Sequence, residues 1–225
     1  MTISIAARCP RTGMLGIAIT TSSICVASRC PWAKAGIGAI VTQNITDPGL
    51  GPRGLDLLAH GLSADETIKR LVEESPHPEY RQLAIVDRHG YSAYYAGVNT
   101  LGTHDVAQGE NCIALGNLLA HPNVPQAMVS AFMEVSAEEP LGERLLTALE
   151  EGLAEGGEAG AVRSAGLLVV DVHPWPLVDL RVDWHDHPVK TLRGLWRRYE
   201  PQINDFILRA LQPDKTFPFL SPENS

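Results

Sequence analysis

Thr2 is the residue of this sequence with the clearest capacity for covalent chemistry. A small residue after the initiator methionine favours removal of Met1, which would leave Thr2 with a free α-amine beside its own hydroxyl. An α-amine has a pKa of about 7.7–8.0 in peptides, so part of it is neutral near pH 7 and can accept the hydroxyl proton. The residue types therefore allow a threonine nucleophile that carries its own base. The alternative is that Thr2 is simply the first residue of an edge strand.

Amide and guanidinium side chains supply candidate substrate contacts. Gln43 and Asn44 end one expected strand and Asn117 ends another, where amides can donate to an oxyanion or a substrate, or bond to their own loops. Asn117 ranks first because the adjacent Gly116 would allow a ligand close to the backbone. Arg53 and Arg81 could each clamp a substrate carboxylate, or could each pair with a nearby acidic residue.

The segment "RVDWHDHP" is the densest polar cluster, with Asp183, His185, Asp186 and His187 in five residues. Alternation along a strand would place Asp183, His185 and His187 on one face, as in some zinc or manganese sites. The same residues also fit a strand end followed by a helix cap before Pro188. We rank capping first, an acidic subsite at Asp183 second and metal binding last.

Bulk composition narrows the class of protein. The 225 residues are 44% hydrophobic and 20% charged, with a net charge of −8, which is typical of a soluble globular chain and argues against nucleic acid as a partner. We find no secretory signal and no apolar run long enough for a membrane span. A cytoplasmic protein without a membrane partner is expected.

The elements that must position these residues follow from periodicity and turn signals. The sequence predicts a hairpin from Thr2 through "CPRTG", a strand at 37–43, a short helix at 55–60, a capping box at Ser63 and Glu66, and a hairpin beginning at 81. A further strand begins near 112, helices cover 125–135 and 141–154, a strand pair surrounds the turn near 174, and one long amphipathic helix covers 187–211.

Blocks of antiparallel strands alternate with pairs of helices, so an α+β fold with helices on both outer sides of two packed sheets fits best. We expect one domain over residues 1–211 and a Pro-rich tail over residues 212–225.

Several stretches in this order resemble a bacterial family of unknown function within the N-terminal-nucleophile (Ntn) hydrolase superfamily. They include "SIAARCPRTGMLGIAITTSS", "PWAKAGIGAIVTQ", "PLGERLLTALEEGLAEGG" and "DLRVDWHDHPV". The resemblance implies a four-layer αββα sandwich related to proteasome subunits, with Thr2 at the nucleophile position. It also implies that Lys34 corresponds to the lysine near the proteasome nucleophile, although related sequences often carry Arg there.

These observations favour an amidohydrolase that cleaves a C–N bond, of amide or ureido type, in a small metabolite. Such a mechanism needs no cofactor and no metal. We expect a homo-oligomer, a dimer, because this sandwich often packs in pairs. The alternative is a non-catalytic protein of the same fold that binds a metabolite or a partner protein.

Overall fold

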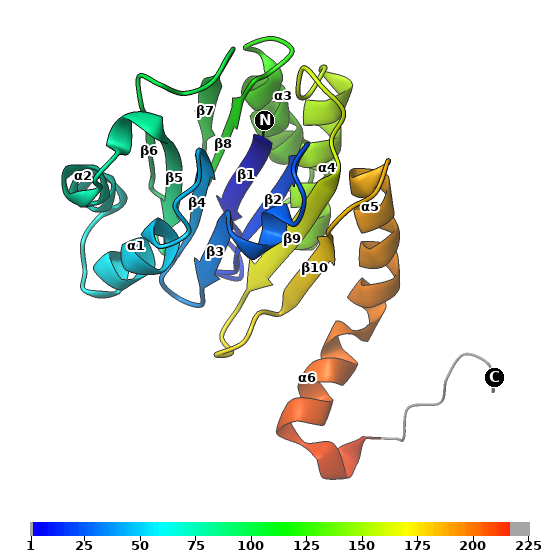
Figure 1. Cartoon of the computed structure of the whole chain (residues 1–225). Helices are drawn as coiled ribbons and strands as arrows, with labels where there is room; N and C mark the ends of the chain where they lie inside the picture. The colour runs from blue at the N-terminus through cyan, green and yellow to red at the C-terminus, as the bar shows by residue number, and fades with distance from the viewer. Residues whose placement is uncertain (1, 217–225) are drawn as a thin grey trace.

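Two stacked antiparallel sheets with helices on both outer faces form the protein (Figure 1). The computed structural model describes residues 2–216. The strand order is β10-β9-β2-β1-β8-β7 in the larger sheet and β3-β4-β5-β6 in the smaller one. The predicted α+β class, a four-layer αββα sandwich, is confirmed.

The strands occupy these positions in the chain. The larger sheet comprises β1 (Thr2–Arg8), β2 (Leu15–Thr21), β7 (Asp105–Gly109), β8 (Cys112–Asn117), β9 (Ser164–Val170) and β10 (Val178–Val182). The smaller sheet comprises β3 (Pro31–Lys34), β4 (Gly38–Asn44), β5 (Arg81–Asp87) and β6 (Ser92–Ala96).

The helices cover the sheets from both sides (Figure 1). Two helices, α1 (Leu50–Ala59) and α2 (Ala64–Glu74), share a core with the smaller sheet. Three helices, α3 (Val124–Glu134), α4 (Leu141–Ala154) and α5 (Pro188–Tyr199), share a core with the larger sheet, and α6 (Ile203–Leu211) follows α5.

Strand β1 lies in the middle of the sandwich, with β2 and β8 on either side. Ile3, Ile5 and Ala7 pack into the core under the helices, whereas Ala6 packs into the core between the two sheets. The alternation of the sequence predicts a half-buried strand, but both faces are buried because the second sheet covers the face that would otherwise meet water. Thr2 and Ser4 share the face of Ala6.

Local signals placed most elements well. Ser63 caps α2 and forms the predicted capping box with Glu66. Helix α4 has the predicted bounds. Helix α1 begins five residues before the predicted Leu55, because Gly51 and Gly54 are packing positions rather than loop residues: a Cβ at Gly54 would lie 2.6 Å from Ile40 Cδ1.

Three predictions at the level of elements were wrong or incomplete. The sequence predicts no strand at β3 or β7, because neither segment is long enough to show a clear alternation. The predicted single helix over 187–211 is α5, a 3-10 turn at Glu200–Gln202 and then α6, because Pro201 cannot donate a helical hydrogen bond. Figure 1 shows α6 extending beyond the ends of the strands.

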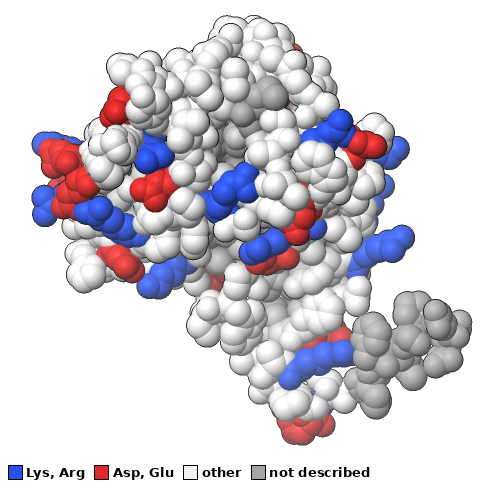
Figure 2. All heavy atoms as spheres, in the orientation of Figure 1, with Lys and Arg blue, Asp and Glu red and all other residues white. Residues whose placement is uncertain are grey.

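The predicted tail is described only in part. Pro213–Lys215 form a 3-10 turn, and residues 217–225 lie outside the described residues. Within residues 2–216, no helix combines the length and apolar character needed to cross a bilayer. On the face drawn in Figure 2, Lys and Arg side chains lie beside Asp and Glu side chains rather than in one positive area.

Candidate functional site

Three polar residues lie side by side where the central strands of the larger sheet end. In the strand register, Thr2 is opposite Thr21 of β2 on one side and opposite Asn117 of β8 on the other. Directly opposed residues point to the same face of a sheet, here the space between the sheets. Thr2 Oγ1 lies 3.2 Å from Thr21 Oγ1, and Thr2 is only 6% exposed.

A buried amide network connects these strand ends to the smaller sheet. Ser4 Oγ donates to Gln43 Oε1 (2.8 Å), and Gln43 Nε2 donates to Gln82 Oε1 (2.8 Å). Asn117 Nδ2 donates to the same Gln82 oxygen (3.0 Å), and Gln82 Nε2 donates to the Gly116 carbonyl (3.0 Å). Because these four side chains are fully buried, the network fixes the two sheets in register beside Thr2.

One atom of this network is left over. Asn117 Oδ1 is buried and has no hydrogen-bond partner among the described residues. The sequence predicts Asn117 as an oxyanion donor, and one of its two amide N–H groups donates to Gln82. An unpartnered acceptor is suited to an ammonium or amide N–H group.

Glu158 adds an acidic group at the same edge. It pairs with Leu119 in an isolated bridge, and its Oε2 accepts a hydrogen bond from the backbone N–H of Ser22 (3.2 Å), the residue after Thr21. Glu158 Oε1 is buried without a partner among the described residues. Burial raises the pKa of Glu158 to about 7, against the lowering effects of the positive charge at the N-terminus and of the Ser22 hydrogen bond. Such a group can hold or release a proton near neutral pH.

A cation reaches Thr2 through two hydroxyls. Arg29 Nη2 donates to Ser23 Oγ (2.6 Å), Ser23 Oγ lies 3.5 Å from Thr21 Oγ1, and Thr21 Oγ1 contacts Thr2. Arg29 Nη1 also donates to the carbonyls of Ile24 and Cys25. The guanidinium therefore orders the loop after β2, which begins next to Thr21.

Lys34, the predicted cation, is not part of this group. It pairs with Gly38 at the start of β4, whereas Gln43 lies near the end of β4 beside Ser4. Five residues of strand separate the two positions, about 17 Å. The resemblance implies a place near Thr2 for Lys34, but Lys34 lies at the β3–β4 turn, which is at the other end of β4 from Gln43.

The other predicted contact residues serve the surrounding structure. Asn44 Nδ2 donates to the Tyr80 carbonyl and its Oδ1 accepts from Leu101 N–H, so Asn44 fastens two loops next to Gln43. Arg81 donates to the Ile45 carbonyl. Arg53 pairs with Glu74 between the outer helices. The contacts of Asn44 and Arg53 are the local alternatives that the sequence leaves open, whereas Arg81 bonds a carbonyl rather than an acidic residue.

The Asp183–His187 segment lies past β10. Asp183 is exposed, and its carbonyl accepts from Cys25 N–H. His185 Nδ1 accepts from the backbone N–H of His187, the N-cap residue of α5. No group of three or more potential metal ligands is found among residues 2–216. The contacts of this segment are those of a helix start.

Gly116 is required for side-chain packing rather than for the approach of a ligand that the sequence predicts. A Cβ there would collide with the side chains of Leu119 and Ile3. The close approach is therefore one of packing under the helices, on the face of the sheet opposite to Thr2.

Residues 2–192 match a family described as a family of unknown function, DUF1028. The chain belongs to this family. Protein SPO2555 from Silicibacter pomeroyi, a DUF1028 protein of solved structure, is 30% identical over 88% of this chain and 85% of its own, with a TM-score of 0.81. All residues of the candidate site, from Thr2 to Glu158, lie within the DUF1028 match.

More distant solved structures include Anbu, named an ancestral beta-subunit, from Yersinia bercovieri. It is 12% identical over 97% of this chain and 99% of its own, with a TM-score of 0.42. Anbu from Hyphomicrobium sp. strain MC1 is 11% identical over 96% and 99%, with a TM-score of 0.45. No curated protein matches this DUF1028 chain.

Sequence reasoning missed Gln82, Glu158 and Arg29. Gln82 carried a signal, because an amide inside the apolar strand "RQLAIVD" must find a buried partner. Glu158 sits among glycines and alanines in a segment without periodicity, and Arg29 lies in an irregular connection. Neither has a spacing that points to Thr2.

Proposed function

We propose that this protein is an N-terminal-nucleophile amidohydrolase that uses Thr2 to cleave a C–N bond of a small metabolite. The observation that carries the proposal is the position of Thr2 at the head of the central strand. It lies between Thr21 and Asn117, beside a carboxyl group of raised pKa. Met1 lies outside the described residues, so its removal stays a prediction.

The reaction follows from the groups of one residue. Thr2 Oγ attacks the carbonyl carbon of the amide while the α-amine of Thr2 takes the hydroxyl proton. The C–N bond then breaks, the leaving nitrogen takes that proton, and an ester on Thr2 remains. Water attacks the ester with the α-amine as base, which releases the acid and restores the hydroxyl.

The neighbouring groups supply charge and orientation for these steps. Asn117 Oδ1 and Glu158 Oε1 are buried acceptors without a partner among the described residues, and such acceptors suit an N–H group of the substrate amide. Hydrogen bonds from Arg29 to Ser23 and to the carbonyls of Ile24 and Cys25 hold the loop that follows Thr21, the neighbour of Thr2.

The substrate class is a small amide or ureide rather than a polymer. The amide side chains next to Thr2 are fully buried, which supports a small substrate over a peptide chain. Binding of small ligands relies on a few polar groups of this kind in a mostly apolar cleft.

Intact mass spectrometry and a β-lactone probe test the proposal together. We expect the purified protein to lack Met1 and to gain the mass of one probe. Thr2→Ala should abolish capture, and Thr2→Ser should retain it, because serine keeps the hydroxyl and the amine. Thr67→Ala, which changes a buried threonine of α2, is the matched control and should label like the wild type.

Retained Met1, or equal labelling of wild type and Thr2→Ala, would contradict the catalytic role. That result would support the alternative of a non-catalytic protein of the same fold. If Thr2 is labelled, a screen of small amides and ureides with release of ammonia as the readout identifies the substrate.

A further inference from the structure

Glu158 is a buried carboxyl group at the end of the central strand, and no described residue neutralises it. It is 6% exposed, its Oε2 accepts a hydrogen bond from Ser22 N–H, and its Oε1 has no partner among residues 2–216. None of the ion pairs within this range includes Glu158. A buried carboxyl in this situation either stays protonated or pairs with a cation that forms later.

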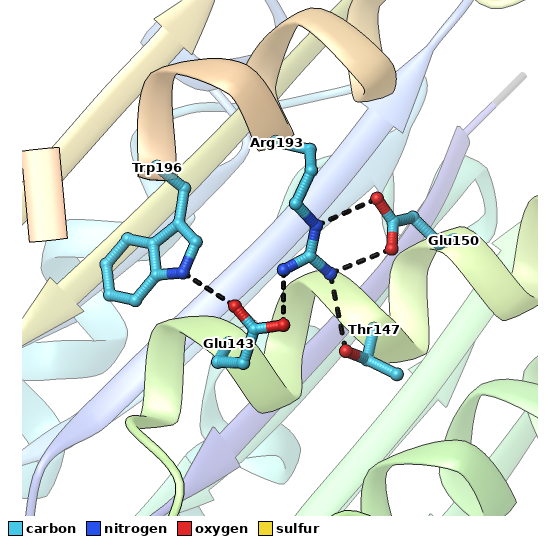
Figure 3. Close-up of polar contacts among 5 residues, drawn as sticks. All are labelled: Glu143, Thr147, Glu150, Arg193 and Trp196. Atoms are coloured by element: carbon cyan, nitrogen blue, oxygen red, sulfur yellow. Dashed lines mark hydrogen bonds and ion pairs between the residues drawn. The ribbon is translucent and has the colours of Figure 1, made fainter. Parts of the chain in front are cut away.

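Arg193 shows a buried charge that the chain completes with its own side chains (Figure 3). It is 8% exposed, and its Nε and Nη2 donate to the two oxygens of Glu150 at 2.9 and 2.8 Å. Its Nη1 donates to Glu143 (2.6 Å). These partners are in place as soon as α4 and α5 pack together. Glu158 differs, because the positive group that lowers its pKa is the N-terminus of the chain.

The segment that carries Glu158 crosses the end of β1. Ala159 N–H donates to the Leu118 carbonyl (2.9 Å), so this segment continues the sheet beside the end of β8. The Glu158 carboxyl reaches Ser22 on the opposite side, at the end of β2. Since β1 lies between β2 and β8, the Glu158 side chain spans the position directly in front of Thr2.

The hydrogen-bond pattern of the sheet places the carboxylate beside the nitrogen of Thr2. Along a strand, successive N–H groups point alternately to the two neighbouring strands. Just past β1, Cys9 N–H donates to the Met14 carbonyl, so odd-numbered positions of this strand face β2. In the β1–β2 register, a continued ladder would pair Ser22 N–H with the carbonyl that is bonded to the Thr2 nitrogen. The acceptor of Ser22 N–H is Glu158 Oε2, which therefore lies next to that nitrogen.

We propose that Glu158 holds the α-ammonium group of Thr2 in the mature chain and shares one proton with it. This inference rests on the proposed removal of Met1 and on the nucleophilic role of Thr2. The ammonium group belongs to the chain itself, so it meets the buried carboxyl without a path from solvent. Asn117 Oδ1 remains as an acceptor for an N–H group of the substrate.

A proton shared in this way makes the amine available as a base. Burial favours the neutral forms of both groups, whereas their mutual attraction favours the ions. The proton moves from the ammonium nitrogen to an oxygen of Glu158: one N–H bond breaks, one O–H bond forms, and the nitrogen keeps the electron pair. The neutral amine then accepts the proton of the Thr2 hydroxyl. Glu158 is thus a positioning residue that acts through the amine.

Other titratable side chains on the segments around Glu158 are engaged elsewhere. They are Arg29, Cys30, His121 and Arg163. Arg163 forms an ion pair with Asp186, and His121 Nδ1 lies 3.8 Å from Glu155 Oε1. Arg29 donates to Ser23 and to backbone carbonyls. Burial raises the pKa of the Cys30 thiol, so the thiol is neutral at pH 7. We therefore expect the α-ammonium to respond most strongly to ionisation of Glu158.

NMR titration of the mature chain, labelled with ¹³C-glutamate or ¹³C-threonine, tests the shared proton. Intact mass first establishes that Met1 is absent, and Thr2→Ser assigns the Thr2 signals. In wild type, the signals of the Glu158 carboxyl and of Thr2 should change in the same two steps, because interacting groups titrate as a pair. In Glu158→Gln, the Thr2 signals should change in one step, at least about one pH unit below the upper step of the wild type.

Glu155→Gln is the matched control, because it removes a nearby carboxylate at the C-cap of α4. It should leave the titration of Thr2 unchanged. Glu158→Asp keeps the charge and should retain the two steps. The rate of β-lactone capture, measured against pH, should follow the titration of the Thr2 amine in wild type and in Glu158→Gln.

Equal titration of Thr2 in wild type and Glu158→Gln would overturn the inference. Independent titration of the two groups in wild type would also overturn it, and this result does not depend on the folding of a variant. Coupled titration without lactone capture would contradict the nucleophile alone, whereas capture with equal titration would contradict the role of Glu158 alone. Retained Met1 would contradict both, since Thr2 would then have no α-amine.

Discussion

The two ends of strand β1 differ in whether the buried polar side chains there have hydrogen-bond partners. At the Thr2 end, the amides of Gln43, Gln82 and Asn117 are buried together and bond to one another. At the other end, Arg8 and Arg144 are left with buried donors that no described residue accepts from. An amide carries both a donor and an acceptor, so amides can satisfy each other, whereas a guanidinium has donors only.

The difference is one of hydrogen-bond satisfaction. A network in which Asn117 Oδ1 alone lacks a partner among the described residues stabilises the contact of the two sheets. A buried guanidinium with unused donors lacks that stabilisation. Arg193, held by Glu143 and Glu150 (Figure 3), shows that the chain can supply acceptors where only structure is required.

Replacement of Gln82 should have the largest effect on stability. Gln82→Leu keeps the volume but leaves Gln43 Nε2 and Asn117 Nδ2 without their acceptor. Two orphaned buried donors should lower the free energy of unfolding by about 4 kcal/mol. Urea unfolding measures this loss. A loss below about 1 kcal/mol would show that the amide network contributes little to the free energy of unfolding.

The second prediction concerns Glu158 and pH. The pKa of Glu158 is about 7 in the folded protein and about 4.3 in an unfolded chain. The folded state therefore binds the extra proton between these values, and stability falls as pH rises from about 4.5 to 7. The loss is about 4 kcal/mol for a shift of this size.

Glu158→Gln should remove this part of the pH dependence, because glutamine stays neutral. Urea unfolding of both proteins at pH 5 and pH 8 measures the difference. The wild type should lose more stability than Glu158→Gln between the two values. Parallel losses would show that the Glu158 carboxyl is not held protonated by burial.

The third prediction compares the two buried arginines. Arg193→Met leaves Glu143 and Glu150 without their cation and should cost about 2 kcal/mol, reduced from the value for a fully buried pair because both carboxylates reach solvent. Arg144→Met removes an uncompensated charge and should change stability by less than about 1 kcal/mol.

Thermal unfolding in a buffer without carboxylates measures both variants. An equally large loss for Arg144→Met would mean that its contact with Phe132 is enough to make Arg144 a structural residue, and the contrast between the two arginines would disappear.

Much of the fold could be predicted from local sequence. The hairpin at Thr2, the capping box at Ser63 and the bounds of α4 depend on residues close together in the chain, and these predictions are confirmed. The single helix over 187–211 failed at Pro201 even though the signal was local, because the amphipathic pattern continues on both sides of the proline.

The candidate site was predictable only in part. Thr2, Gln43 and Asn117 lie together, because strand ends in one sandwich meet at the same edge. Lys34 does not lie with them. It is next to the β3–β4 turn, at the other end of β4 from Gln43. Gln82, Glu158 and Arg29 had no spacing that would connect them to Thr2.

By itself, the sequence determined that the chain forms layered antiparallel strands and helices and that a threonine begins the first strand, since propensity, alternation and turn chemistry act over a few residues. Only the tertiary structure decided which polar groups surround that threonine and which arginine lacks a carboxylate. Arg144 and Arg193 are the same residue type on amphipathic helices, and their difference arises from the neighbours that packing brings to each. Burial and charge compensation are properties of contacts between distant segments, so they exist only once the layers have assembled.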